Sequence, residues 1–280
     1  MFLSYIFRIL NFTEGFLMSI KILVCIKQVV DSNIPSSAYV LDDSNLSIIP
    51  PQGVPPIING FDEIAVEAAL QIKENVDASI TVASVGDQFV MDVIKKPLSM
   101  GADELILVQD PEFADLDSFN TVFVLKHLID FLDGFDLILC GRQASDWDNS
   151  TVPFGLAEVL DLPIVTLAQD IQIQNNRILV QRIINGGYEL VESTLPTVVT
   201  VTNEFGEARY PTLMGIMSAS RKAPMILNAS EIGFGSLQPS IQLNRLFLPT
   251  RADKCEIILG ESLADAAESM VFRLRDENII

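Results

Sequence analysis

The chain has 280 residues, of which 49% are hydrophobic and 20% are charged, so it can bury at least one substantial core. Its formal net charge of -19 at pH 7 disfavours nucleic acids and anionic membrane surfaces as partners, although backbone N–H groups can still hold the phosphates of a small nucleotide. Three cysteines without a C-x-x-C pair fit a reducing cytoplasm, and they fit neither a disulfide framework nor a structural zinc site.

The first residues are apolar, but charged and polar positions interrupt them at Arg8, Asn11, Glu14 and Gly15. No uncharged run approaches the ~20 residues that a membrane-spanning helix requires, and no A-x-A cleavage site follows. Met18 stands two residues before a strong strand. We therefore expect residues 1–18 to be an N-terminal extension or to contain a mis-called translation start, with a weak signal anchor as the less favoured alternative.

Strand and helix signals then alternate. Residues 19–27 form a continuous apolar run that suits a parallel strand buried on both faces, and a hairpin is expected around 42–45. A helix should begin at Asn59, with Asp62 completing a capping box. Further strands are predicted at 79–85, 104–108 and 136–140, and further helices near Val90 (kinked by Pro97), at 119–132 and at 151–160.

This β-α-β-α-β-α-β order predicts the α/β class, with a doubly wound, mostly parallel, Rossmann-like sheet and helices on both faces. After Leu160 the pattern changes to short strands, in which 171–173 and 177–184 flank a turn at 174–176 as a β-hairpin insertion. Strands at 188–192 and 197–202 follow, and a last helix is expected at 262–274. We expect one α/β domain at 19–224 and a C-terminal arm at 225–280, which is too thin to have its own core.

The usual nucleotide and catalytic fingerprints, such as a P-loop, G-x-G-x-x-G, G-x-S-x-G and H-E-x-x-H, are missing from the sequence. In a doubly wound sheet, however, ligands bind at the carboxyl ends of the strands near the switch in strand order. Four polar loops fall at such ends: 28–32, 59–62, 86–87 and 141–151. A nucleotide site can therefore be predicted from position even though no fingerprint marks it.

The loop at 141–151 is the richest of the four. Residues 149–151 suit the N-terminal end of the following helix, which we call its mouth, and the unpaired N–H groups there form an anion site. Asp146 and Asp148 could accept hydrogen bonds from ribose hydroxyls, and Trp147 could stack on a ring. The alternative is a solvated loop with an ordinary helix cap.

Catalytic and metal chemistry find little support. Two aspartates in one loop, without a companion cluster, argue weakly for a metal, and no base–nucleophile pair stands out. His127, the single histidine, falls in an apolar helical stretch that suits a core or surface position. We expect no catalytic residue and no metal site.

At the 141–151 loop the sequence resembles the electron-transfer flavoprotein β subunits, whose G-[KR]-Q-A-x-D signature stands here as Gly141-Arg142-Gln143-Ala144-Ser145-Asp146. Other matches follow in family order at 21–29 (KILVCIKQV), 59–67 (NGFDEIAVE), 100–103 (MGAD), 185–187 (NGG), 195–200 (LPTVVT) and 208–217 (ARYPTLMGIM). Together they cover roughly residues 20–224, which makes the resemblance far more specific than one motif.

The resemblance implies an adenine nucleotide α-hydrolase-like fold and an obligate heterodimer with an α subunit that holds the redox FAD. The β subunit then holds AMP, or a second FAD in electron-bifurcating members. Carried over by position, the cofactor-binding residues are Cys25, Asn59, Gly60, Phe61, Asp62, Val85, Gly86, Gly141, Arg142, Gln143, Asp146, Trp147, Asp148, Asn149, Ser150, Thr151 and Val152.

The resemblance also implies two contact surfaces. A recognition loop would dock a flavin-dependent dehydrogenase, such as an acyl-CoA dehydrogenase, through Leu213, Met214, Ile216 and Met217. The C-terminal arm would pack against the α subunit.

The sequence departs from the family pattern in both functional segments. Thr151 stands in place of the usual Gln, and Pro153 in place of the usual Gly. In the recognition loop, Ser218 and Ser220 stand where many relatives carry lysines, which implies either a different partner or a weaker electrostatic docking term. Three readings follow: a simple electron-transfer β subunit, a bifurcating subunit whose β-bound FAD accepts hydride from NADH, and a non-redox nucleotide-binding regulatory protein.

Overall fold

The computed structural model describes residues 19–35, 38–42, 46–114, 116–174, 176–235, 239–248, 255 and 257–280. The predictions made for residues 1–18 and for the turn positions 43–45 and 175 lie outside the described residues. The chain divides between Asn244 and Arg245 into two compact units, of which the first contains the sheet and the second the last helix.

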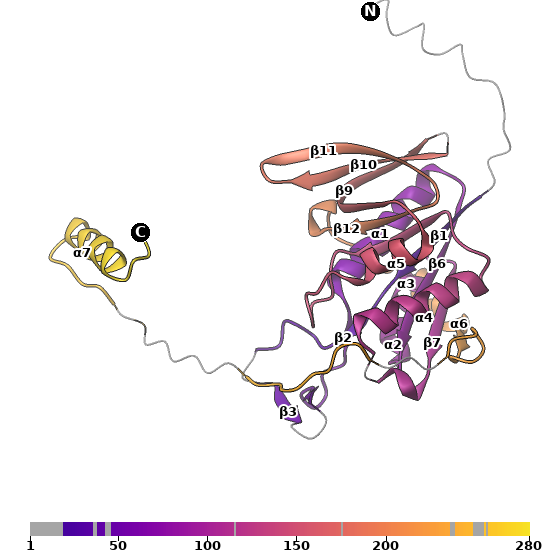
Figure 1. Cartoon of the computed structure of the whole chain (residues 1–280), viewed down its shortest axis with the longest axis horizontal. Helices are drawn as coiled ribbons and strands as arrows, with labels where there is room; N and C mark the ends of the chain where they lie inside the picture. The colour runs from indigo at the N-terminus through magenta and orange to yellow at the C-terminus, as the bar shows by residue number, and fades with distance from the viewer. Residues whose placement is uncertain are drawn as a thin grey trace, which may run out of the picture. The chain divides into compact units, whose positions relative to one another are not determined.

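A central sheet organises the first unit, and its described residues form nine strands in the order β11-β10-β9-β12-β8-β1-β6-β7-β13 (Figure 1). The strands from β9 to β13 in that order are mutually parallel, whereas β10 runs antiparallel to both β9 and β11. The strands are β1 (Ile20–Cys25), β6 (Ala78–Gly86), β7 (Glu104–Gln109), β8 (Leu137–Gly141), β9 (Ile164–Gln174), β10 (Arg177–Ile184), β11 (Gly187–Thr194), β12 (Thr197–Val201) and β13 (Met225–Leu227). The predicted α/β class with a mostly parallel sheet is confirmed.

Helices cover both faces of this sheet, because its strands carry apolar side chains on both sides. In β1, Ile22 and Val24 point into one core, and Leu23 points into the other. The first core is covered by α1 (Gly60–Asn75), α2 (Met91–Ile94), α3 (Lys96–Met100) and α6 (Leu213–Arg221). The second core is covered by α4 (Ser118–Phe131) and α5 (Val152–Leu160), and short 3-10 turns lie at Pro111–Phe113 and Asn203–Phe205.

Between β1 and α1 the chain forms two small antiparallel pairs. Strands β3 (Val40–Asp42) and β4 (Ser47–Ile49) pair with each other, on either side of the predicted hairpin turn. Strands β2 (Gln28–Val29) and β5 (Ile57–Ile58) also pair, and this brings the start of α1 back to the end of β1.

Several predicted boundaries shift. The helix expected near Val90 is two short helices that meet at Lys95, and Pro97 lies in the first turn of the second, where its missing N–H is harmless. Strand β9 begins at Ile164, earlier than the predicted 171. Residues Met225–Leu227 follow the predicted domain boundary, yet they form β13 and pair with β7 at the sheet edge.

The predicted recognition loop is a helix, α6, so its assignment as a loop was wrong. The Thr212 side chain caps it by accepting the Gly215 N–H at 3.0 Å. Gly215 lies so close to α3 that a Cβ there would stand 2.2 Å from the carbonyl oxygen of Ser99. Tertiary packing therefore stabilises a helix that Pro211 and Gly215 make weak in the sequence.

In the second unit, α7 (Leu263–Asp276) is capped by Ser262, whose hydroxyl accepts the Asp265 N–H at 3.2 Å. None of the described residues after Asn244 is buried, and α7 exposes Leu263, Met270, Val271 and Phe272. Across the described ranges, no helix is both long and apolar enough to cross a membrane.

Candidate nucleotide-binding site

The carboxyl ends of β1 and β8 are the natural ligand position in this sheet, and we call this position the crevice. The two strands are parallel neighbours, with Cys25 paired to Cys140. From β1 the chain leads to α1 on one face, and from β8 it leads to α5 on the opposite face. Their following segments thus separate here, as they do where doubly wound folds bind ligands. The predicted loops at 59–62 and 141–151 meet at this point.

Asp62, in the first turn of α1, joins the ends of the two strands. One carboxylate oxygen accepts the backbone N–H of Lys27 at 2.8 Å, and the other accepts the backbone N–H of Gly141 at 3.2 Å. Burial raises the pKa of Asp62 to about 7, although these two backbone donors and Asn59 act to lower it. The group is therefore close to half protonated at neutral pH.

Asn59 fixes the loop that follows β8. Its fully buried side-chain amide donates to the carbonyl oxygen of Gln143 at 2.8 Å and accepts the backbone N–H of Ser145 at 3.1 Å. Its own backbone N–H donates to the carbonyl oxygen of Lys27 at 2.8 Å. The predicted capping box is therefore wrong: Asn59 stands at the N-cap of α1 but makes no side-chain cap bond, because the main chain across the crevice takes both of its polar atoms.

Gly141 allows the two segments to approach this closely. A Cβ at this position would lie 2.3 Å from Asp62 Oδ1 and 2.8 Å from the Cβ of Phe61. The guanidinium of the next residue, Arg142, lies over the Phe61 ring at 5.1 Å from its centre. Arg142 Nε also donates to Gln143 Oε1 at 3.2 Å. Arg142 therefore contacts both its neighbour in the loop and the first turn of α1.

Both aspartates predicted to meet a ribose already have partners. Asp146 Oδ2 lies 2.6 Å from Lys27 Nζ, and Asp148 Oδ1 accepts a hydrogen bond from Gln143 Nε2 at 2.6 Å. A ligand would share or replace these contacts. Lys27 was missed by the sequence reasoning, although its place directly after the first strand was a usable signal.

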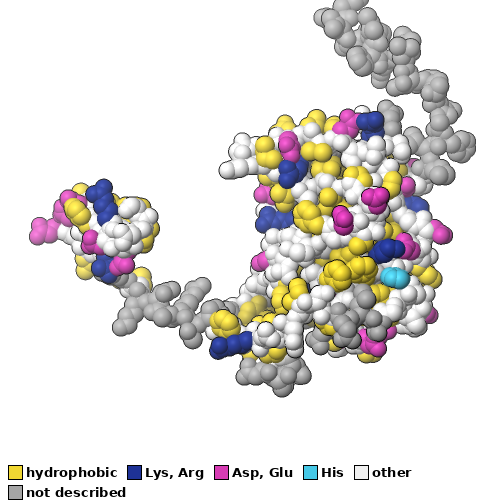
Figure 2. Space-filling view, in the orientation of Figure 1, with side chains coloured by type: hydrophobic (Ala, Val, Ile, Leu, Met, Phe, Trp, Pro, Cys, Tyr) yellow, Lys and Arg dark blue, Asp and Glu magenta, His cyan; other side chains and the backbone are white. Residues whose placement is uncertain are grey.

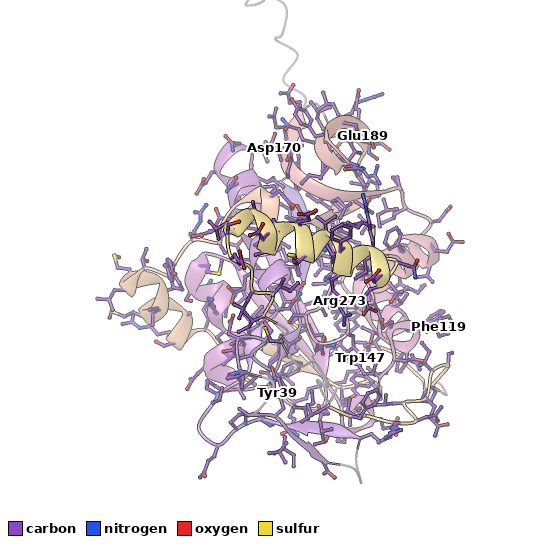
Figure 3. The ribbon with its side chains drawn as sticks, turned by 90° about the vertical axis from the view of Figure 1, so that its left-hand side faces the viewer. Tyr39, Phe119, Trp147, Asp170, Glu189 and Arg273 are labelled. Atoms are coloured by element: carbon purple, nitrogen blue, oxygen red, sulfur yellow. The ribbon has the colours of Figure 1, made fainter. Side chains whose placement is uncertain are left out.

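The tip of the loop is strained and exposed. Asp148 and Ser150 adopt the left-handed conformation, with φ of 52° and 56°, which costs non-glycine residues of order 1 kcal/mol each. The Trp147 side chain, labelled in Figure 3, is 55% exposed. Strain concentrated on an exposed aromatic tip is typical of a binding loop.

The mouth of α5 follows directly. Thr151 is its N-cap and makes no side-chain cap bond, and hydrogen bonding within the helix begins where Gly155 N–H donates to the Thr151 carbonyl at 3.0 Å. The N–H groups of Val152 and Phe154 are those that helix geometry leaves without an acceptor in the helix. Asn149 and Ser150 lie just before this mouth, and anion binding here stays a prediction.

The remaining predicted cofactor residues flank the crevice. Val85 and Gly86 end β6, on the side of β1 away from β8, and Gly86 pairs with Gln109 of β7. Cys25 ends β1, and its thiol, together with burial, raises the pKa of Cys140, which stays protonated at neutral pH. Among the described residues, no group of three His, Cys, Asp or Glu side chains is placed to hold a metal ion.

The predicted docking residues lie apart from this crevice, on α6. Leu213 and Met214 are 74% and 82% exposed, and Ile216 and Met217 are about half exposed. The side chains on the face of the first unit shown in Figure 2 include charged groups of both signs interspersed with apolar ones. An exposed apolar group on a well-seated helix is suited to bind another protein.

Comparisons with known proteins match most of the chain to one family. A family model described as electron transfer flavoprotein domain matches residues 48–232. The chain is 35% identical over 266 residues to caffeyl-CoA reductase-Etf complex subunit CarD of Acetobacterium woodii, with 93% of this chain and all of the relative covered. It is 33% identical, with the same coverage, to an electron transfer flavoprotein subunit beta of Thermoanaerobacterium thermosaccharolyticum, and 34% identical to that of Megasphaera elsdenii over 82% of this chain and 87% of the relative.

The close approach at Gly141 gives a stability prediction. We expect Gly141→Ala to lower the free energy of unfolding by about 2–3 kcal/mol, because the added methyl group collides with Asp62 and Phe61. Gly187→Ala is the control, since nothing lies within 4 Å of a Cβ there. Urea unfolding measures both, and equal stabilities for the two variants would contradict the described packing.

The raised pKa of Asp62 gives a pH prediction. The folded chain holds this proton more tightly than the unfolded chain, so the stabilisation is complete below about pH 4 and is lost as the pH rises through about 7. Relative to Asp62→Asn, the wild-type protein should lose up to about 4 kcal/mol of unfolding free energy over this range. The free energy of unfolding of the wild type minus that of Asp62→Asn is the quantity to follow. If it stays constant from pH 4 to pH 8, or increases toward neutral pH, Asp62 is ionised throughout.

Proposed function

The chain belongs to the electron transfer flavoprotein family, and we propose that, as one of its β subunits, it binds an adenine nucleotide in the crevice between β1 and β8. Electron transfer is the role of the chain, because its relatives over most of its length are β subunits of this family. The nucleotide, the flavin arrangement and the individual contacts are our proposals.

The arrangement of Asn59 and Asp62 is the observation that carries the nucleotide proposal. Both are buried polar side chains, and both use main-chain groups across the crevice as partners. Burying such groups is costly unless every bond is made. These two buried side chains at the strand ends hold the loop after β8 in a defined conformation, as a site for a small ligand requires.

The local chemistry supports a nucleotide in one orientation. Its phosphate would accept hydrogen bonds at the mouth of α5, close to residues 149–152. Its ribose hydroxyls would donate to Asp146 and Asp148, in exchange with the contacts from Lys27 and Gln143. Its base would stack on Trp147. AMP satisfies these positions without a redox group, so its role in this account is structural.

The second unit supports assembly with an α subunit. Helix α7 exposes four large apolar side chains and none of its residues is buried, so it lacks a core of its own. We propose that residues 245–280 pack on the α subunit and that this subunit holds the redox FAD. Electrons would then pass through the partner's flavin, and α6 would dock a flavin-dependent dehydrogenase such as an acyl-CoA dehydrogenase.

Counting cofactors in the assembled protein tests this function. We expect the chain, expressed with its α subunit, to release one FAD and one AMP per heterodimer on denaturation. Two FAD would favour the alternative in which the β site takes part in electron bifurcation. Nucleotide without any flavin, in a chain that recruits no α subunit, would contradict the electron-transfer account and favour a regulatory protein.

Trp147 gives the most specific prediction for the site. Trp147→Ala should weaken nucleotide binding by about 1–3 kcal/mol, the usual value of one stacked base, because the indole is the aromatic group of the loop. Tyr188→Ala on β11 is a matched control, since its side chain is 58% exposed against 55% for Trp147. The readout is AMP retained per heterodimer after extensive dialysis. Equal retention in both variants would remove Trp147 from the site.

A further inference from the structure

Helix α6 is too short to hold its own position. It has nine residues, and only Ala219 among them is buried. Isolated helices of this length are unstable in water, so α6 depends on its anchors. Two lie at the helix itself: Gly215 fits against α3, and Lys222, which follows the helix, donates from Nζ to the Asp103 carbonyl oxygen at 2.9 Å.

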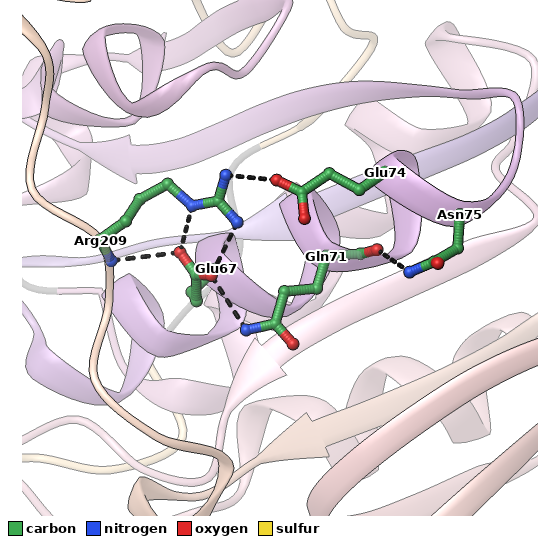
Figure 4. Close-up of polar contacts among 5 residues, drawn as sticks. All are labelled: Glu67, Gln71, Glu74, Asn75 and Arg209. Atoms are coloured by element: carbon green, nitrogen blue, oxygen red, sulfur yellow. Dashed lines mark hydrogen bonds and ion pairs between the residues drawn. The ribbon is translucent and has the colours of Figure 1, made fainter.

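A third anchor precedes the helix and is the strongest of the three. Arg209 lies three residues before the Thr212 cap and reaches back to α1 (Figure 4). One carboxylate oxygen of Glu67 accepts the Arg209 backbone N–H at 3.1 Å and its Nε at 2.7 Å, and the other accepts Nη2 at 2.8 Å. Gln71 adds a bond to Glu67 at 2.9 Å, and Glu74 accepts Arg209 Nη1 at 2.6 Å.

The carboxylate at the centre of this network is 6% exposed, whereas the Arg209 side chain is 35% exposed. Burial raises the pKa of Glu67, but the bonds from Arg209 and Gln71 outweigh it, so the pKa lies below its usual value and the group is ionised at neutral pH. A buried charge pair adds little net stability compared with an apolar pair of the same size. The pair instead fixes the orientation of Arg209 relative to α1, because the N–H groups of a planar guanidinium point in set directions.

We propose that Arg209 and Glu67 are positioning residues that hold the entry to α6, so that the apolar face of this helix is presented to the electron-transfer partner. The inference rests on the proposed docking role of α6. It explains why an ionised carboxylate is buried in the middle of α1, five residues beyond Asp62. Within the described residues, the side-chain hydrogen bonds of Arg209 and Glu67 go to each other, to Glu74 and to Gln71, and none goes to Asn59, Asp62 or the 141–151 loop, so we assign the effect of the pair to α6.

Arg209→Lys in the full heterodimer is the test. Lysine keeps the charge and the backbone bond to Glu67 but loses the paired guanidinium bonds and the contact with Glu74. Arg182→Lys on β10 is the matched control: Arg182 is also 35% exposed, and it bonds Glu189 and Thr166 at 2.6 and 3.1 Å, remote from α6 in the sheet.

The electron donor in the assay is an acyl-CoA dehydrogenase reduced by its acyl-CoA substrate, and a small dye serves as an acceptor that needs no docking surface. If α6 occupies its docking position only a tenth of the time in Arg209→Lys, the KM for the dehydrogenase rises about tenfold with kcat retained. Reduction of the dye by heterodimer whose flavin has been reduced chemically, without the dehydrogenase, should stay at the value of Arg182→Lys, as should cofactor content and melting temperature. Amide exchange of residues 213–221 should accelerate about tenfold, because the helix opens locally.

Unchanged KM and unchanged exchange in Arg209→Lys would overturn the proposal. A fall of kcat, melting temperature and protection throughout the first unit together would also overturn it, because it would show a general structural role. A wild-type heterodimer that reduces the dye after chemical reduction of its flavin, but takes no electrons from the dehydrogenase, would overturn the docking role of α6, and the exchange rates would then decide whether Arg209 positions the helix.

Discussion

Two buried side chains at the start of α1, Asn59 and Asp62, bind the ends of β1 and β8 to the loop between β8 and α5. They act where the segments that follow these two parallel strands leave toward opposite faces of the sheet, which is where doubly wound folds bind ligands. The contact geometry requires glycine at 141, and it leaves the mouth of α5 and the Trp147 tip exposed beside a fixed main chain. The candidate site is therefore a consequence of how the sheet is joined.

Helix α1 serves both functional regions of the first unit. Its first turn supplies Asp62 to the crevice, and its middle supplies Glu67 to Arg209. On either side of Glu67 the helix is packed on the sheet by Ala65, Ala68 and Ala69, small residues that bring it close to the strands. One well-packed helix thus contacts both the proposed nucleotide site and the segment that leads into the proposed docking helix α6.

The sequence predicts the parallel strands well, because β1 and β8 are apolar on both faces and form continuous runs. It also predicts which loops lie together at the strand ends, where we propose the site, since these loops follow from the fold class. The partners of Asn59 and Asp62 could not be found in this way: a local capping rule accounts for the same residues, and only tertiary structure brings residues 59 and 145 together. Helix α6 was missed because packing of Gly215 on α3, and not local propensity, stabilises it.

The central claim is that the nucleotide lies between β1 and β8, and a crystal structure of the heterodimer tests it most directly. The account predicts nucleotide density with its phosphate at the mouth of α5 and its base against Trp147, while Asp62 still accepts the N–H groups of Lys27 and Gly141. Nucleotide density elsewhere on the chain, or an empty crevice in a heterodimer that retains its AMP, would contradict the account.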